Sequence, residues 1–168
     1  MNSTLLVNIS RFILLLTVQI VIFNHMNFLG YIIPLPYILF IILYPVNGNK
    51  SALLLASFLL GITMDLFSNS GGIHATACLV LAYARPTIFK FSFGVSYEYQ
   101  TIKLNDILTP ERFSFILISV VIHHVTLFIL EAFQISFLWD ILLRTVSSTV
   151  FTIISCILII YLIKPNKR

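Results

Sequence analysis

The chain has 168 residues, of which 59% are hydrophobic and only 10% are charged. Soluble domains carry about a quarter charged residues, and disordered chains combine low hydrophobicity with high net charge, so both classes are excluded. The net charge of +4 does not indicate nucleic-acid binding, because membrane proteins concentrate basic residues in cytoplasmic loops. At about 20 apolar residues per crossing, this length allows five or six spans and no sizeable soluble domain.

Six apolar segments follow one another, and we expect an all-α integral membrane protein with six transmembrane helices. The fifth segment has the clearest start, because Thr109, Pro110 and Glu111 supply an N-cap, a proline at the first helical position and an acid facing the helix dipole. The second to fourth segments are short for a hydrocarbon core of about 30 Å, and five crossings stay open if the second is re-entrant. The predicted spans are 5–23, 31–46, 51–67, 72–89, 110–133 and 141–163, within one domain covering 1–168.

The basic residues are distributed unevenly between the two sides that six crossings define. The termini and the second and fourth loops share one side, which holds every Lys and Arg except Arg144. Cytoplasmic loops carry the excess of Lys and Arg in membrane proteins. We therefore expect both termini to be cytoplasmic.

Four charged or titratable residues are predicted near the outer ends of helices. Asp65 ends the third segment and His74 opens the fourth, while Glu131 and Arg144 flank the connection between the fifth and sixth. A charge at membrane depth costs about 2.5–3.5 kcal/mol at a helix centre, so each needs a partner or a function. We predict that the four form one network below the outer surface. It either docks a partner or ligand, or it only pins the helix ends together.

Two adjacent histidines, His123 and His124, lie near the middle of the fifth segment. His124 and Glu131 are seven residues apart, or two helical turns, and are expected to share a face. Histidines at this depth can relay protons or bind metal. Neighbouring side chains on a helix point about 100° apart and no second ligand set has helical spacing, so we favour imidazoles that hydrogen-bond across helices over a metal site.

Small residues recur at helical spacing in two segments, which favours close helix packing within the chain or against a partner. The two cysteines, Cys78 and Cys156, lie in apolar runs and are expected to be free thiols. No catalytic motif has its diagnostic spacing, so neither an enzyme nor a cofactor is expected. The predicted packing residues are Ser57, Gly61 and Gly72, and in the sixth segment Thr145 and Thr149, followed by Thr152 and Cys156.

Several strings resemble the family of the rod shape-determining protein MreD. Residues 61–75, GITMDLFSNSGGIHA, match its hallmark G-x-x-x-D and G-x-H-A region, and residues 40–45 (FIILYP) and 82–86 (AYARP) flank it. Residues 123–133, HHVTLFILEAF, are similar to the fifth-helix signature of one branch of the family. The resemblance covers essentially the whole chain. The positions that match the family strings are Gly61, Asp65, Gly72, His74, Arg85 and Pro86, followed by His124 and Glu131.

This resemblance implies a non-enzymatic scaffold subunit of the bacterial cell-elongation complex in the inner membrane. It implies binding to an MreC-like bitopic protein, and an indirect link to MreB, RodA and a class B penicillin-binding protein in lateral peptidoglycan synthesis and cell shape. It also implies a fold similar to the substrate-binding subunit of energy-coupling-factor transporters. That similarity leaves a second function open, a membrane subunit that captures a small molecule, although the short outer loops favour the scaffold.

Overall fold

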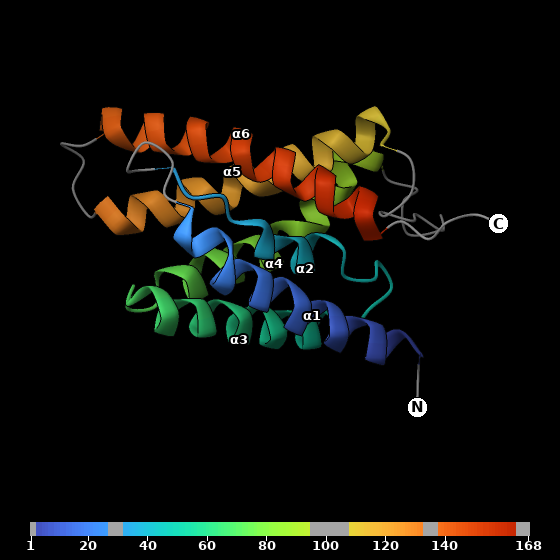
Figure 1. The fold of residues 1–168 in the computed structure, drawn as a ribbon. Helices are drawn as coiled ribbons and strands as arrows, with labels where there is room; N and C mark the ends of the chain where they lie inside the picture. The colour runs from blue at the N-terminus through green and yellow to red at the C-terminus, as the bar shows by residue number, and fades with distance from the viewer. Residues whose placement is uncertain (1–2, 27–31, 95–107, 133–137, 164–168) are drawn as a thin grey trace.

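The computed structural model describes residues 3–26, 32–94, 108–132 and 138–163, and the regular elements within these ranges are helical. Five long helices run back and forth along one bundle (Figure 1). α1 begins and α6 ends at the same end of the bundle. The long helices are α1 (Ser3–Val21), α3 (Lys50–Ser68), α4 (Ile73–Phe93), α5 (Pro110–Ala132) and α6 (Leu138–Ile163), and the short ones are η1 (Phe23–His25), η2 (Pro36–Ile38) and α2 (Leu39–Ile42).

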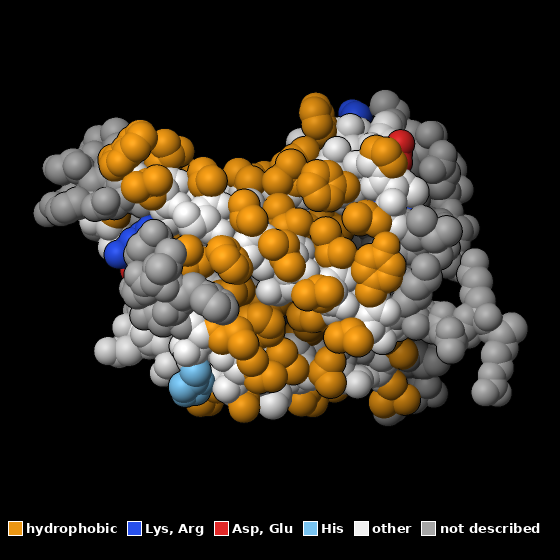
Figure 2. All heavy atoms as spheres, turned by 45° about the horizontal axis from the view of Figure 1, so that its top comes forward, with side chains coloured by type: hydrophobic (Ala, Val, Ile, Leu, Met, Phe, Trp, Pro, Cys, Tyr) orange, Lys and Arg blue, Asp and Glu red, His pale blue; other side chains and the backbone are white. Residues whose placement is uncertain are grey.

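Four of the described helices are candidate membrane spans by length and composition. Among the described residues, four helices are long and apolar enough to cross a membrane, and they correspond to the first, third, fifth and sixth predicted segments. Helix α4 has the required length but lower hydropathy, and it continues past the predicted end at residue 89 to Phe93 with Pro86 inside it. Figure 2 shows apolar side chains across the middle of one face, with the few charged side chains and histidine toward its ends.

The predicted span 31–46 is not a single helix. Among its described residues, 32–46, only η2 and the four-residue α2 are helical, and residues 33–35 are irregular. Pro34 and Pro36 account for this, because proline lacks the N–H that a helix needs and disfavours helical backbone in the residue before it. The segment still runs from one end of the bundle to the other, between the long helices (Figure 1). Residues 32–44 are called the broken segment below.

The broken segment forms the centre of the core. Tyr37, Ile38, Leu39 and Ile41 are fully buried, and the segment packs on α1, α4 and α6. Irregular backbone at membrane depth is tolerated only where protein buries it or where it lines a cavity. The surrounding long helices therefore have to shield this backbone and supply its hydrogen-bond partners.

Helices α3 and α4 form a closely packed hairpin. A Cβ atom added at Gly61 of α3 would lie 2.6 Å from the main-chain nitrogen of Ala75 in α4. Only glycine therefore allows this approach, which confirms the prediction that Gly61 packs helices and places that contact within the chain. Ser57, one turn earlier, is also fully buried.

Replacing Gly61 with leucine is expected to lower the free energy of unfolding by about 3 kcal/mol, because overpacking a tight interface typically costs 1–3 kcal/mol and here the clash is with backbone. The measurement is the thermal unfolding midpoint in detergent, followed by circular dichroism. Ala52→Leu on the exposed side of α3 adds similar bulk and is the control. Equal midpoints for the two variants would contradict the role assigned to Gly61.

The small residues of α6 also face the bundle interior. Thr145, Thr149, Thr152 and Cys156 are all buried, which decides between the two alternatives in favour of packing within the chain. Helix α5 begins with an N-cap. The side chain of Thr109 accepts a hydrogen bond from the main-chain nitrogen of Arg112 at 3.4 Å. This contact confirms the predicted start of the fifth helix at Pro110.

Candidate functional site

Asp65 fixes the turn between α3 and α4. Its Oδ1 accepts hydrogen bonds from Ser70 Oγ at 2.6 Å and from the main-chain nitrogen of His74 at 2.9 Å. Its Oδ2 accepts one from the main-chain nitrogen of Ala75 at 2.9 Å. These N–H groups open α4 and have no partner within their own helix. Asp65 therefore meets His74, as predicted, but caps its main chain and does not pair with its imidazole.

The same turn explains Gly72. Its φ is +99°, a conformation that side chains with a Cβ rarely adopt, and a Cβ built there would meet no atom within 4 Å. Gly72 therefore serves the turn that leads into α4, and its predicted role in helix packing is wrong. Asn69 adopts the left-handed conformation as well, with a φ of 53°.

Glu131 and Arg144 form a separate ion pair. Arg144 Nη1 lies 3.3 Å from Glu131 Oε1, and the two side chains are 48% and 43% exposed, with the larger value for Glu131. Exposed pairs of this kind contribute about 0–1 kcal/mol. No described contact joins this pair to Asp65, so the predicted network of four residues divides into two groups.

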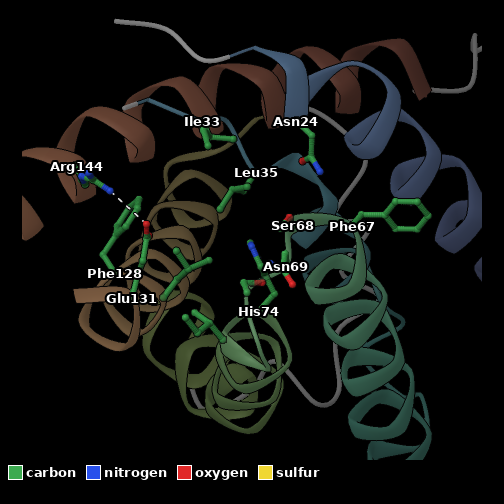
Figure 3. A pocket seen from close by; sticks show the side chains of 13 residues that line it. Asn24, Ile33, Leu35, Phe67, Ser68, Asn69, His74, Phe128, Glu131 and Arg144 are labelled. Atoms are coloured by element: carbon green, nitrogen blue, oxygen red, sulfur yellow. Dashed lines mark hydrogen bonds and ion pairs between the residues drawn. The ribbon is translucent and has the colours of Figure 1, made fainter. Parts of the chain in front are cut away.

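Both groups border one cavity of about 640 Å³ at the end of the bundle away from the start of α1. His74 and Asn69 lie on one side of it, opposite Ile33 and Leu35, while the Glu131–Arg144 pair lies at a third edge (Figure 3). The lining is thus mixed, with polar groups from His74, Asn69 and the ion pair and apolar groups from Ile33 and Leu35. Its other lining residues are Asn24, Phe67, Ser68, Ser70, Ile73, Leu127 and Phe128.

Beneath the cavity, Tyr37 joins two histidines. Its hydroxyl lies 2.9 Å from Nδ1 of His74 and 2.9 Å from Nε2 of His123. The thiol of Cys78 lies 3.8 Å from the same hydroxyl. Helices α4 and α5 thus hold the broken segment through one phenol, which is fully buried.

His124 belongs to a second buried chain of hydrogen bonds. Its Nδ1 lies 2.9 Å from the carbonyl oxygen of Val120, and its Nε2 lies 3.2 Å from Thr152 Oγ1. A carbonyl only accepts, so Nδ1 carries the proton and Thr152 donates to Nε2. Thr152 Oγ1 in turn accepts from the main-chain nitrogen of Leu35 at 3.0 Å. His124 hydrogen-bonds across helices as predicted, but it does not line the cavity with Glu131.

Gln19 on α1 is a central residue that the sequence interpretation missed. Its Nε2 donates to the carbonyl oxygen of Pro34 at 3.1 Å and to Asn24 Oδ1 at 3.0 Å. Its Oε1 accepts from the main-chain nitrogen of Tyr37 at 3.3 Å. The available signal was an amide side chain deep within an apolar span, because such a group requires buried partners.

Two arginines satisfy the carbonyl groups where α2 ends. Arg11 donates to the carbonyl oxygen of Leu43 at 3.1 Å. Arg85 donates to that of Ile42 at 3.4 Å and also to that of Tyr44. The last carbonyls of a helix lack partners within it. Arg85, predicted to lie within the fourth segment toward its cytoplasmic end, is buried in α4.

The described part of the site consists of hydrogen-bonding groups around a cavity. Among the side chains that the structure describes, no three His, Cys, Asp or Glu are placed to hold a metal ion. Comparison with models of known families, with curated proteins and with solved structures finds no match to this chain. The resemblance to MreD rests on the strings of residues described above.

Proposed function

We propose that this chain is an MreD-like scaffold subunit of the bacterial cell-elongation complex, with six crossings of the inner membrane and both termini in the cytoplasm. It binds an MreC-like bitopic partner through the end cavity, and through that partner it acts with MreB, RodA and a class B penicillin-binding protein. The broken segment provides the second crossing in this proposal. The cavity then opens on the outer face.

The cavity is the observation that carries this proposal. It lies at a bundle end where the α3–α4 turn is held by three hydrogen bonds to Asp65, so its wall is preorganised for binding. At the opposite end, Lys50 begins α3, Lys90 lies in the last turn of α4 and Arg112 in the first turn of α5. An excess of basic residues marks the cytoplasmic side, which supports an outward cavity.

The small-residue stripes are not part of the proposed docking site. Gly61 packs against Ala75, and Thr149 and Thr152 are buried within the bundle. These surfaces are already occupied within the chain. A partner is therefore expected to contact the cavity and its rim. The exposed apolar side chains of the long helices are expected to contact lipid.

A volume of about 640 Å³ also lies within the 300–1,000 Å³ of typical small-molecule sites. This favours, as a second candidate, a subunit that captures a small molecule for an energy-coupling-factor-type transporter. Such a subunit has to associate with a pair of ABC-type ATPases and a coupling subunit. The two candidates therefore differ in the proteins that stay bound.

The test is a pull-down of the tagged chain from its native host in mild detergent, with mass spectrometry of the retained proteins. We expect an MreC-like protein, together with RodA or its transpeptidase partner. Recovery of ABC-type ATPases in their place would support the transport subunit and contradict the scaffold. Recovery of neither set under conditions that preserve other membrane complexes would contradict both.

A further inference from the structure

A second cavity lies at the opposite end of the bundle, where α1 and α3 begin and α4 ends (Figure 1). It has a volume of about 400 Å³ and is bounded by the first turns of α3, the second half of α4 and the turn before α3. The charged residues in its described lining are Lys50 and Arg85, and both are basic. Tyr83 and Thr87 also line it and are exposed, so the cavity opens on the surface of the bundle.

The register of α3 against α4 gives the depth of this cavity in a membrane. The two antiparallel helices meet at Gly61 and Ala75. Lys50 lies 11 residues before Gly61 and Pro86 lies 11 residues after Ala75, so Lys50 and Pro86 are at one level. Helix α3 is a candidate span of 19 residues that starts at Lys50. Because this length of helix extends about 28 Å, the level of Lys50 coincides with one edge of a hydrocarbon core about 30 Å thick.

The side chains on either side of this level suit the boundary between hydrocarbon and headgroups. Tyr83, which is 80% exposed, lies three residues or about 4.5 Å deeper along α4, at a depth where aromatic side chains with a polar tip are enriched. Lys90 is exposed and lies about 6 Å further out than Pro86. Its spacing of three residues from Thr87 and seven from Tyr83 puts it on the same face of α4. A basic rim therefore lies above an interfacial aromatic.

The basic groups at this cavity differ in how they are held. Arg85 is buried and donates to the carbonyl oxygens of Ile42 and Tyr44, so its charge is fixed in the inner wall. Lys50 and Lys90 are exposed, and the structure shows no ion pair between either of them and a carboxylate of the described residues. Each has an ammonium group on a flexible stem. These two groups can therefore reach an anion at the mouth of the cavity.

This combination matches a phospholipid headgroup that carries net negative charge. Basic pockets between membrane-spanning helices bind such headgroups, and lipid phosphates lie just outside the hydrocarbon edge, which is the level of Lys50 and Lys90. A zwitterionic headgroup adds its own cation, which the basic residues repel. Leu54 and Ala82 line the same cavity and give an acyl chain an apolar surface. A free phosphate ion makes no use of that surface.

We propose that this cavity binds the headgroup of an anionic phospholipid, with the ammonium groups of Lys50 and Lys90 on its phosphate and Arg85 as a fixed positive charge behind it. The acyl chains then extend past Tyr83 toward the middle of the bundle. The proposal requires only that the chain lies in a membrane. It is therefore independent of the partner proteins named above, and the pull-down does not decide it.

The first test uses fluorescence quenching by lipids with brominated acyl chains. Replacing Trp139, the single tryptophan, with phenylalanine removes the native signal, and Tyr83→Trp places a reporter at the mouth of the cavity. The full chain is reconstituted in phosphatidylcholine vesicles with a minor fraction of brominated lipid. Brominated phosphatidylglycerol is expected to bind beside the reporter at least about fivefold more strongly than brominated phosphatidylcholine. Equal quenching by the two lipids would overturn the proposal.

A second reporter separates a defined site from general attraction to the basic end of the bundle. Leu6 of α1 is 53% exposed at the same end and does not line the cavity. Leu6→Trp, in the same Trp139→Phe background, is expected to be quenched nearly equally by the two brominated lipids. A preference for phosphatidylglycerol at Leu6 as large as that at Tyr83 would overturn a specific site.

Charge variants identify the residues that bind the phosphate. Lys50→Gln and Lys90→Gln are each expected to lower the lipid preference at the Tyr83→Trp reporter about fivefold, because one basic residue near an anionic headgroup changes affinity by about that factor. Lys50→Arg keeps the charge and is expected to keep the preference. Arg144→Gln removes the same charge at the other end of the bundle and is the matched control. An unchanged preference in the folded Lys50→Gln, Lys90→Gln double variant would overturn the proposal.

Competition with inorganic phosphate distinguishes a lipid from a free anion. Inorganic phosphate in excess, compared with chloride at the same ionic strength, is expected to leave quenching by brominated phosphatidylglycerol unchanged, because the free ion gains nothing from the apolar wall. Displacement of the lipid by phosphate, with no effect of chloride, would make the cavity a site for free anions. That result would overturn the assignment to a phospholipid.

Discussion

Replacing Asp65 with alanine is expected to lower the free energy of unfolding by about 3–5 kcal/mol. The change removes the acceptor of two main-chain N–H groups in α4 and of the Ser70 hydroxyl. Hydrogen bonds to a charged group contribute about 1.5–3 kcal/mol each, and the two main-chain donors left behind are buried. The thermal unfolding midpoint in detergent, followed by circular dichroism, measures the loss.

Two further variants make this result specific. Asp65→Asn retains one side-chain oxygen as acceptor, so it is expected to lose only about half as much stability. Glu131→Gln removes a charge from the exposed ion pair and is expected to change the free energy of unfolding by less than about 1 kcal/mol. If Asp65→Ala unfolded at the same temperature as Glu131→Gln, Asp65 would not be the cap of α4. Weak partner binding by Asp65→Ala would then need another explanation.

Replacing Gln19 with leucine is expected to lower the free energy of unfolding by about 2–4 kcal/mol. The two side chains have similar size, so the change mainly leaves the Pro34 carbonyl and the Tyr37 main-chain N–H without partners. Each unsatisfied buried group costs about 1–3 kcal/mol. Thr17→Val on the exposed side of α1 removes a polar atom that faces outward, and is expected to leave the unfolding midpoint nearly unchanged.

Hydrogen exchange gives a second measurement for Gln19. In the unmodified protein the Tyr37 amide is bonded to Gln19 Oε1 at 3.3 Å and is fully buried, so slow exchange is expected. In Gln19→Leu, the same amide is expected to exchange faster, while amides within α3 keep their rates. A uniform change over both regions would indicate global destabilisation and contradict a local role for Gln19.

The features that the sequence predicted correctly depend on local pattern. Long apolar runs give four of the helices, because crossing length and hydropathy are properties of consecutive residues. The capped start at Thr109 and Pro110 is equally local. Gly61 was identifiable as a packing residue by its spacing, but the contact with Ala75 had to come from the structure.

The features that the sequence did not predict depend on residues far apart in the chain. Pro34 and Pro36 indicated an irregular segment. The side chains that hydrogen-bond to its backbone, Gln19 and Thr152, lie on α1 and α6 and were not predicted. Likewise, the sequence placed Asp65 and Arg144 at the same end of the bundle. Residues at the same end need not be in contact, and the sequence does not show which of them are. The links between Tyr37 and two histidines have no local signature at all.

The broken segment has a consequence for membrane insertion. Its Leu35 N–H is bonded to Thr152, which lies 117 residues later in the chain. When residues 32–44 leave the ribosome, this partner has not been synthesised, and an unsatisfied backbone group in lipid costs several kcal/mol. The segment therefore reaches its final position only after α6 is made. Until then the nascent chain has to hold it in water, at the lipid surface or against the insertion machinery.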